Sequence, residues 1–266
     1  MLGRLPMTLS IRAELDYQLA EPTDILLQLE AAAIPEQRII SANIAISDCD
    51  HFARVPAQDG VGERIWLRAQ GRLTVDYAAR VAIERVLSDC TGLDRLSPHL
   101  LPGETVQYLL PSRYCPSDQF ETFVQAEFGR LEGGAQINAM REWIGRTMAY
   151  VPGVSTSDTT ALESFVKRQG ICRDYAHILI TFARAAGIPA RFASVYALGV
   201  EPQDFHAVTE VFLGGEWHLV DATGMAIEAE MAKIGIGRDA ADVAFLTAFG
   251  SAVMNRQRVQ VEHASD

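Results

Sequence analysis

The sequence is poor in cysteine and in clustered positive charge, and both shortages narrow the range of functions. Four cysteines are spread over 266 residues with no CxxC pair: Cys49, Cys90, Cys115 and Cys172. A zinc ribbon or a thioredoxin-type redox site is therefore not expected. The formal net charge is −11, and Lys and Arg gather nowhere along the chain. Because nucleic-acid binding needs clustered basic side chains, we expect no nucleic-acid partner.

Long apolar runs are also missing. No segment is long and apolar enough to span a bilayer, and the first ten residues contain one Arg and no sustained apolar core. We therefore expect no membrane partner, no signal peptide and a cytoplasmic protein with reduced thiols. Hydrophobic residues make up 48% of the chain and charged residues 21%. These proportions are typical of a folded globular protein, and a chain of this length can bury a core without disulfides.

The first 110 residues show the alternation of β structure. Odd positions of Leu9–Tyr17 are apolar, and the same pattern runs through Leu73–Ile83. Further candidate strands lie at residues 25–34, 38–46 and 63–69, and turn signals such as Glu21-Pro22-Thr23-Asp24 separate them. Several short strands divided in this way favour a sandwich. We predict an N-terminal β-sandwich domain over residues 1–110.

A proline-rich stretch between Pro98 and Pro116 is interpreted as the connection to a second domain, residues 111–266. The hydrophobic period then changes, and helices are predicted at residues 118–128, 135–148 and 160–168. From Arg191 to Asp221 the pattern returns to strands, and a last strand is predicted near residues 258–262. The fold class is therefore α+β.

A fourth helix is predicted from Gly170 to Ala186, where Gly187-Ile188-Pro189 ends it. It carries Cys172 in its first turn, where free N–H groups and the helix dipole favour a thiolate and can hold an oxyanion. The alternative is that Cys172 is a small buried hydrophobe, the commoner fate of a free cysteine. His177 is expected to face solvent or bond locally, because it belongs to a polar stripe of this helix: Asp174, His177, Thr181 and Arg184.

A hairpin follows the helix. Gly214-Gly215 is a two-residue turn signal between two strands, and the register that it sets pairs Phe212 with Trp217. Continuing that register places His206 diagonally from Asp221 on one face, within side-chain reach, and His218 on the other face. A carboxylate there can fix the imidazole tautomer. An ordinary polar pair near a strand end is the alternative.

The stretch from Gly170 to Gly224 resembles the transglutaminase-like superfamily. The resemblance is carried by four motifs in order: Gly170-Ile171-Cys172, Gly187 to Arg191, His206-Ala207-Val208-Thr209-Glu210, and Trp217 to Asp221 followed by Thr223. The strand-rich first region also looks like the N-terminal domain of bacterial transglutaminase-like proteases. Two positions depart from the common family pattern, Val208 where many members have Trp and Ala222 where many have Pro. Neither departure removes a reacting group.

The resemblance implies a papain-like core, in which a helix bearing the cysteine packs on an antiparallel sheet, and a catalytic triad of Cys172, His206 and Asp221. Asp174 and Tyr175 are possible supporting residues. The activity implied is acyl transfer at amide bonds of a peptide or protein substrate, with hydrolysis favoured. Transfer of glutamine acyl groups to amines and non-catalytic peptide binding are the alternatives. No cofactor is indicated, and the spacing of Cys172, Asp174, His206 and Asp221 does not support a metal site. The sequence does not indicate an oligomeric state.

Overall fold

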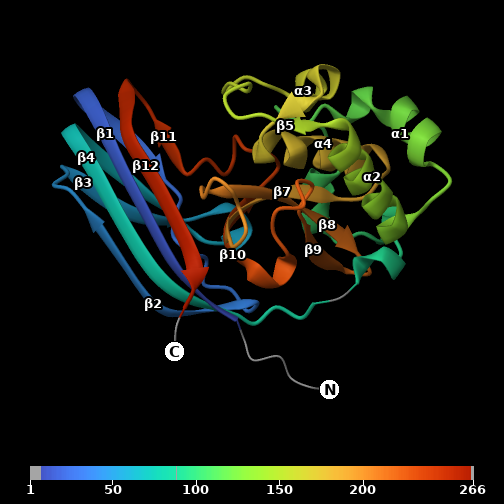
Figure 1. Ribbon diagram of the computed structural model, residues 1–266, viewed down its shortest axis with the longest axis horizontal. Coiled ribbons are helices and arrows are strands. Elements are labelled where there is room, and N and C mark those ends of the chain that lie inside the picture. Colours follow the sequence, from blue (N-terminus) through green and yellow to red (C-terminus); the bar gives the residue numbers. More distant parts are fainter. Residues whose placement is uncertain (1–6, 88, 265–266) are drawn as a thin grey trace.

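The computed structural model describes residues 7–87 and 89–264. Residues 1–6, on which part of the expectation about a signal peptide rests, lie outside the described residues. Within the described ranges, no helix combines the length and the apolar character needed to cross a membrane. The chain forms two lobes, a large antiparallel sheet on one side and a helical part with a smaller sheet on the other (Figure 1).

The large sheet has six strands and is built around two long ones, β1 (Met7–Leu27) and β4 (Glu63–Ile83). β2 (Gln37–Ile46) and β3 (His51–Pro56) both pair with β4. The other edge comes from the far end of the chain, because β11 (Leu246–Ala248) and β12 (Ala252–His263) pair with β1. The alternating pattern is confirmed, since odd-numbered residues of β1 such as Leu9, Ile11 and Leu15 are buried.

The α+β class and the β-rich first region are confirmed, but the strands form one continuous sheet rather than the two separate sheets of a sandwich. The reason is that β1 and β4 pair with each other along nearly their whole length, from Met7 opposite Ile83 to Leu27 opposite Ile65. The predicted turn at Glu21–Asp24 lies inside β1, where the pairing with β4 shifts register between Leu19 and Thr23. A shift of this kind bends a strand without ending it.

The helical lobe contains α1 (Glu121–Phe128), α2 (Gly133–Thr147), α3 (Ala161–Lys167) and α4 (Cys172–Ala185). Its four-stranded antiparallel sheet has the order β10-β7-β8-β9. The bounds are Met231–Gly237 for β10, Ala190–Ala197 for β7, His206–Leu213 for β8 and Glu216–Val220 for β9. Two short strands, β5 (Ala149–Tyr150) and β6 (Gln169–Gly170), pair in parallel beside the start of α4. The four predicted helices are therefore present within two or three residues of their expected bounds.

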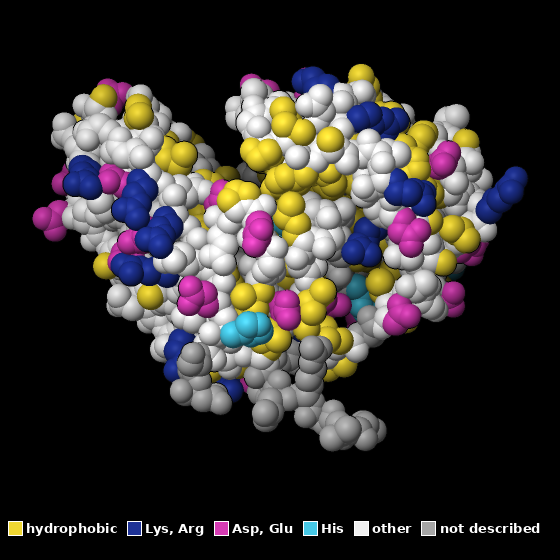
Figure 2. All heavy atoms as spheres, viewed as in Figure 1, with side chains coloured by type: hydrophobic (Ala, Val, Ile, Leu, Met, Phe, Trp, Pro, Cys, Tyr) yellow, Lys and Arg dark blue, Asp and Glu magenta, His cyan; other side chains and the backbone are white. Residues whose placement is uncertain are grey.

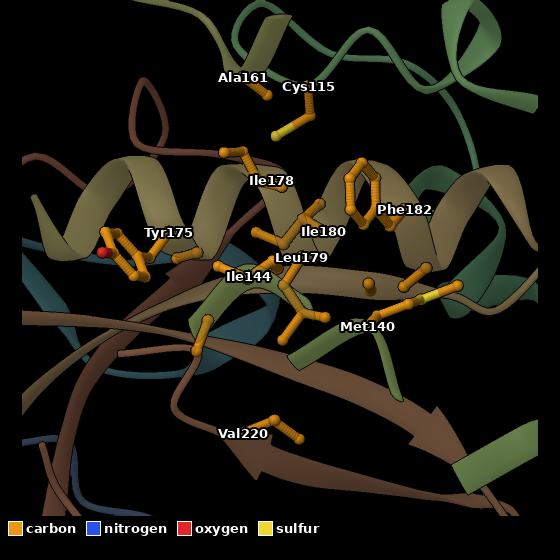
Figure 3. Packing of buried hydrophobic residues seen from close by; sticks show 14 of the residues in the cluster. Cys115, Met140, Ile144, Ala161, Tyr175, Ile178, Leu179, Ile180, Phe182 and Val220 are labelled. Carbon is orange, nitrogen blue, oxygen red and sulfur yellow. The ribbon is translucent and has the colours of Figure 1, made fainter. Parts of the chain in front are cut away.

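The four-stranded sheet lies between the helices and the six-stranded sheet (Figure 1). One of its faces packs on the apolar face of the large sheet, where Tyr196 of β7 stacks on Tyr77 of β4 with ring centroids 6.2 Å apart. The other face packs against α4, whose hydrophobic side chains meet α2 and β9 (Figure 3). The predicted domain boundary near residue 110 stays a prediction, although the C-terminal strands β11 and β12 complete the first region's sheet.

The polar stripe of α4 is buried, which excludes the solvent-facing alternative for His177. Asp174, His177 and Thr181 are 0% exposed and Arg184 is 4% exposed. Two loops cover this stripe and use its polar groups as anchors. Arg184 donates to the carbonyl oxygens of Leu110, Ala190 and Arg238 and to Ser112 Oγ. The helix is therefore buried from Asp174 to Arg184, and Cys172 at its start is partly buried.

Candidate active site

The hairpin of β8 and β9 brings His206 and Asp221 together. Its register is the predicted one, with Leu213 opposite Glu216 and Phe212 opposite Trp217. His206 begins β8 and Asp221 directly follows β9, so both lie at the same end of the hairpin. Nε2 of His206 is 3.0 Å from Oδ2 of Asp221.

His218 takes no part in this pair. It lies within β9, and its Nε2 is 3.2 Å from the carbonyl oxygen of Leu213. The period of two along the strand had already separated it from Asp221. The structure thus pairs His206, and not His218, with Asp221, while the catalytic role of His206 stays a prediction.

The carboxylate of Asp221 is fixed by three bonds besides the one to His206. Oδ1 accepts from the backbone N–H of Thr223 at 2.8 Å and from its hydroxyl at 2.7 Å, and Oδ2 accepts from the N–H of Ala226 at 3.0 Å. Burial acts to raise the pKa of Asp221. The hydrogen bond and the charge of His206, together with the hydrogen bonds from Thr223 and Ala226, outweigh burial and lower the pKa. Asp221 is thus an ionised and oriented partner for the imidazole.

Cys172 interacts with the same imidazole. Burial alone would lower the pKa of His206, but Asp221 and then Cys172 interact with the ring and raise its pKa to about 9. Nε2 is engaged by Asp221, and Nδ1 has no hydrogen-bond partner among the described residues. Nδ1 is therefore the nitrogen that is available to the sulfur. A protonated imidazole between a carboxylate and a sulfur favours a thiolate–imidazolium pair.

The start of α4 is fixed by Asp174. Its Oδ2 accepts from the backbone N–H of Ile171 at 2.8 Å, as an acidic residue at the third helical position commonly does, and from the hydroxyl of Ser155. Its carboxylate is completely buried. Farther along, Thr209 of β8 donates to the carbonyl oxygen of Ala176 at 3.2 Å and ties the strand of His206 to this helix. Asp174 thus fixes the start of the helix that carries Cys172, and Thr209 fixes the strand that carries His206 against that helix.

The predicted supporting residue Tyr175 lies apart from the reacting groups. It is 4% exposed and belongs to the hydrophobic core under α4 (Figure 3). Tyr150 lies nearer to the sulfur. The pairing of β5 with β6 places Tyr150 opposite Gly170, two residues before Cys172. Burial first, and then the charge of Cys172, raise the pKa of Tyr150 to about 12, and its hydroxyl interacts with the backbone N–H and the sulfur of Cys172.

Tyr150 is the site residue that sequence reasoning missed by name. The sequence does not assign a second oxyanion donor, for which Tyr175 and a residue upstream of Cys172 are both candidates, and a two-residue parallel pairing leaves no periodic signal in a sequence. The Tyr150-Val151-Pro152-Gly153 segment offered only a turn signal.

Two of the three predicted residues border a cavity of about 510 Å³, and Asp221 is not part of its lining. Cys172 and His206 line it, Tyr150 and Phe192 form part of its wall, and Gln257 reaches it from β12 of the large sheet. Figure 2 shows the molecule hollowed between its two lobes, with hydrophobic side chains gathered in the hollow. A largely apolar cavity with a few polar groups beside a nucleophile is suited to hold an acyl substrate.

The remaining candidates from the sequence are placed as follows. His177 stacks on Tyr114 with centroids 5.2 Å apart, and its Nε2 accepts from the N–H of Ala240 at 3.2 Å. It therefore supports the cavity wall and lies outside the reacting group. Over residues 7–87 and 89–264, no three His, Cys, Asp or Glu side chains converge as metal ligands would.

Comparison with known proteins identifies this region. Residues 118–222 match the Transglutaminase-like superfamily. A solved structure from Cytophaga hutchinsonii, described as a candidate cysteine protease, superposes with a TM-score of 0.91 at 29% identity and covers 99% of this chain and 92% of its own. The predicted resemblance is therefore confirmed, and the C. hutchinsonii structure has the same fold over nearly the whole chain.

Two further relatives are more distant. An uncharacterized protein of Mycobacterium leprae is 27% identical over 148 residues, which are 52% of this chain and 53% of that protein, so the match spans about half the length of that relative. The periplasmic domain of TgpA from Pseudomonas aeruginosa aligns with a TM-score of 0.43 at 16% identity over 83% of this chain and 91% of that domain.

Proposed function

Because residues 118–222 are those of the transglutaminase-like superfamily, we propose that the protein is a cysteine enzyme that transfers acyl groups from amide bonds. Cys172 is the nucleophile, His206 the general base and acid, and Asp221 the residue that orients the imidazole. The observation that carries the proposal is one imidazole that contacts a carboxylate at 3.0 Å and also interacts with the cysteine that opens α4. The C. hutchinsonii relative described as a candidate cysteine protease supports the same class.

The first half of the reaction forms a thioester. His206 takes the proton from Cys172, and the thiolate attacks the carbonyl carbon of the amide to form a tetrahedral oxyanion. The imidazolium then gives its proton to the amide nitrogen. The C–N bond breaks, an amine or ammonia leaves, and the acyl group remains on the sulfur. The carboxylate of Asp221 keeps Nε2 protonated, so that Nδ1 exchanges the proton with the sulfur.

The oxyanion needs hydrogen-bond donors at the place where its charge develops. The backbone N–H of Cys172 is one donor, because it lies at the start of α4 and has no partner within the helix. The hydroxyl of Tyr150 is the second, since it already interacts with that N–H and with the sulfur. A substrate carbonyl oxygen that lies between the N–H of Cys172 and the hydroxyl of Tyr150 accepts a hydrogen bond from each.

Water resolves the thioester in a hydrolase, and an amine resolves it in a transglutaminase. We propose hydrolysis of a peptide or protein amide, because no calcium loop or separate amine-binding motif is recognisable in the sequence. A cytoplasmic location remains a prediction from the sequence. Transfer to an amine uses the same residues, and product analysis separates the two outcomes: a free carboxylate in the first case and a new amide in the second.

The test is to trap and locate the thioester. The protein is mixed with peptide and glutamine-amide substrates, quenched in acid, and mapped by mass spectrometry. An acyl adduct on Cys172 that is absent from Cys172→Ala and strongly reduced in His206→Ala supports the proposal. Turnover that survives Cys172→Ala would refute the nucleophile.

A non-catalytic peptide-binding protein is the competing function. Iodoacetamide distinguishes it, because a thiolate–imidazolium pair reacts much faster than an ordinary thiol. Preferential labelling of Cys172 that is lost in His206→Ala supports the enzyme. Slow and equal labelling of all four cysteines supports the binding protein.

A further inference from the structure

Asp204 is a second acidic residue beside the reacting groups, and the mechanism does not use it. It lies two residues before His206, is accessible to solvent, and lines the same cavity as Cys172. Its Oδ1 accepts from the side-chain amide of Gln257 and from the N–H of Phe205 at 2.7 Å. Both bonds go to one oxygen, which leaves Oδ2 to a ligand.

The charge of Asp204 is not balanced by the protein. Among residues 7–87 and 89–264, no Lys or Arg forms an ion pair with it. Arg256 lines a second groove together with Asp204, but its ion pair is with Glu14 at 3.6 Å. Partial burial raises the pKa of Asp204, and its two hydrogen bonds offset only part of that rise. This is the behaviour of a carboxylate that lacks a cationic neighbour.

Besides the pair of Cys172 and His206, the described residues of the cavity wall include one other charged residue, Arg173, which is already engaged. Arg173 donates to the carbonyl oxygen of Thr156 at 2.6 Å and lies 3.4 Å from Oδ1 of Asp174. Its guanidinium is held on the side of Tyr114, with 5.8 Å to the ring centroid. Arg173 therefore belongs to the frame that fixes the start of α4, and Asp204 is left as the uncompensated charge in the wall.

Aromatic rings border the same end of the cavity. Phe205 and Phe245 both line it and stack on each other with centroids 4.6 Å apart and planes 12° apart. Tyr150, whose pKa is also raised by the charge of Asp204, lines the cavity from the other side. A carboxylate among aromatic rings binds an organic cation through both its charge and the ring faces.

We propose that this end of the cavity is a subsite for an ammonium or guanidinium group of the substrate, with Asp204 as the residue that selects it. The proposal rests on the proposed function, because a cation subsite selects substrates only if Cys172 attacks the amide that accompanies the cation. Two sources can supply such a group. It is carried either on the peptide that contains the scissile amide, as a Lys or Arg side chain or an α-amine, or on a separate amine that resolves the thioester.

The first experiment measures selectivity. Peptides that the wild-type protein cleaves are made in sets that differ at one position near the scissile amide, with Lys, norleucine or Glu. At the position that reaches the subsite, kcat/KM for Lys is expected to exceed that for norleucine by about tenfold, because a charge-assisted hydrogen bond is worth roughly that factor. In Asp204→Asn the ratio is expected to fall to near one. A Lys-to-norleucine ratio near one at every position of the wild-type protein, or the same ratio in both proteins, overturns a peptide-borne cation.

The matched control is Glu201→Gln, which removes one negative charge from the same exposed loop but does not line the cavity. Its Lys-to-norleucine ratio is expected to equal that of the wild type. A general effect of net charge would move the ratio in both variants by the same factor, and that result would also overturn the role of Asp204.

The second experiment separates the two sources. A labelled alkylamine is offered as acceptor with a neutral acyl donor, and incorporation is measured in the wild type and in Asp204→Asn. Loss of incorporation with an unchanged Lys-to-norleucine ratio assigns the subsite to the acceptor amine. Loss of neither signal excludes a cation subsite of either kind.

A binding measurement keeps this inference distinct from the enzymatic proposal. In Cys172→Ala, fluorescence anisotropy of the labelled Lys and norleucine peptides reports affinity with no reaction. A preference for Lys that disappears in Cys172→Ala/Asp204→Asn supports the subsite even where no turnover is found. Equal affinity for both peptides, in a protein that cleaves them, overturns the subsite and leaves the proposed function intact.

Discussion

Nε2 of His206 and Oδ2 of Asp221 lie 3.0 Å apart, although 15 residues of a hairpin separate them in the chain. The short distance follows from the two-glycine turn, because the register that the turn sets brings the start of β8 and the end of β9 to one edge of the sheet. The pair fixes which nitrogen of the imidazole is left for Cys172.

Replacing Asp221 with Asn is expected to lower kcat/KM by at least about 100-fold, since the amide orients the ring without stabilising its charge. The alkaline limb of the pH profile is expected near pH 9 in the wild type, because activity needs a protonated His206 and its pKa is raised to about 9. Removing the carboxylate lowers that pKa, so the limb moves to lower pH. Asp118→Asn, at an exposed position, is the control, and an unmoved limb in Asp221→Asn contradicts the assignment.

The same raised pKa predicts how stability depends on pH. His206 is protonated more readily in the folded protein than in the unfolded chain. Its contribution to the free energy of unfolding is therefore complete below about pH 6.5 and is lost as pH rises through about 9. Urea unfolding at pH 6 and pH 9.5 should show a smaller loss in Asp221→Asn than in the wild type. Equal losses would argue against the His206–Asp221 interaction as its source.

Thr223→Val is expected to lower kcat about tenfold with little change in KM, because the substitution removes the hydroxyl that holds Oδ1 of Asp221 at 2.7 Å. The backbone N–H of Thr223 still donates to Oδ1, so the loss should be smaller than in Asp221→Asn. Steady-state kinetics measure it. Thr8→Val in β1 provides the same chemical change far from the site and should leave kcat as it was.

Tyr150→Phe is expected to lower kcat by about 10- to 100-fold while KM changes little, as loss of one oxyanion donor does. Tyr175→Phe is the matched control, because Tyr175 lies in the core and does not line the cavity. Comparable losses in both variants would indicate a packing effect and remove Tyr150 from the oxyanion site.

Glu210→Gln is expected to destabilise the fold by about 3–5 kcal/mol, the usual effect of breaking a buried ion pair. Glu210 is buried between Arg191 and Lys233, and despite burial those two cations lower its pKa to about 2. The wild type should therefore lose this stability as pH falls from about 4.5 towards 2, and the variant should not. Asp76→Asn, which breaks an exposed pair with Arg12, should change the denaturant midpoint little.

The hairpin and the cysteine helix could be predicted because their signals are local. A two-glycine turn sets the register of its own strands, and a Gly-Ile-Pro stop ends the helix that precedes it. The strands β1, β2, β4 and part of β12 were found for the same reason, since alternation is written into each strand separately, whereas β3 and β11 were not predicted. The roles of Cys172, His206 and Asp221 in catalysis stay predictions.

The features that could not be predicted from the sequence depend on contacts between segments that are distant in the chain. In the sequence, the polar stripe of α4 looks the same whether it faces water or protein. Nothing near Arg184 in the chain shows that its guanidinium binds the carbonyl oxygens of Leu110 and Arg238. The continuity of β1 through Glu21–Asp24 is likewise set by its pairing with β4. The position of Tyr150 depends on a pairing too short to leave a pattern.

The pairing of β12 with β1 has a consequence for biosynthesis. Gln257, which steadies Asp204 in the cavity wall, is synthesised after Cys172, His206 and Asp221. A nascent chain that has already formed its hairpin and its cysteine helix still lacks one wall of the cavity. Closure by β12 therefore completes the cavity only after all three of these residues have been made.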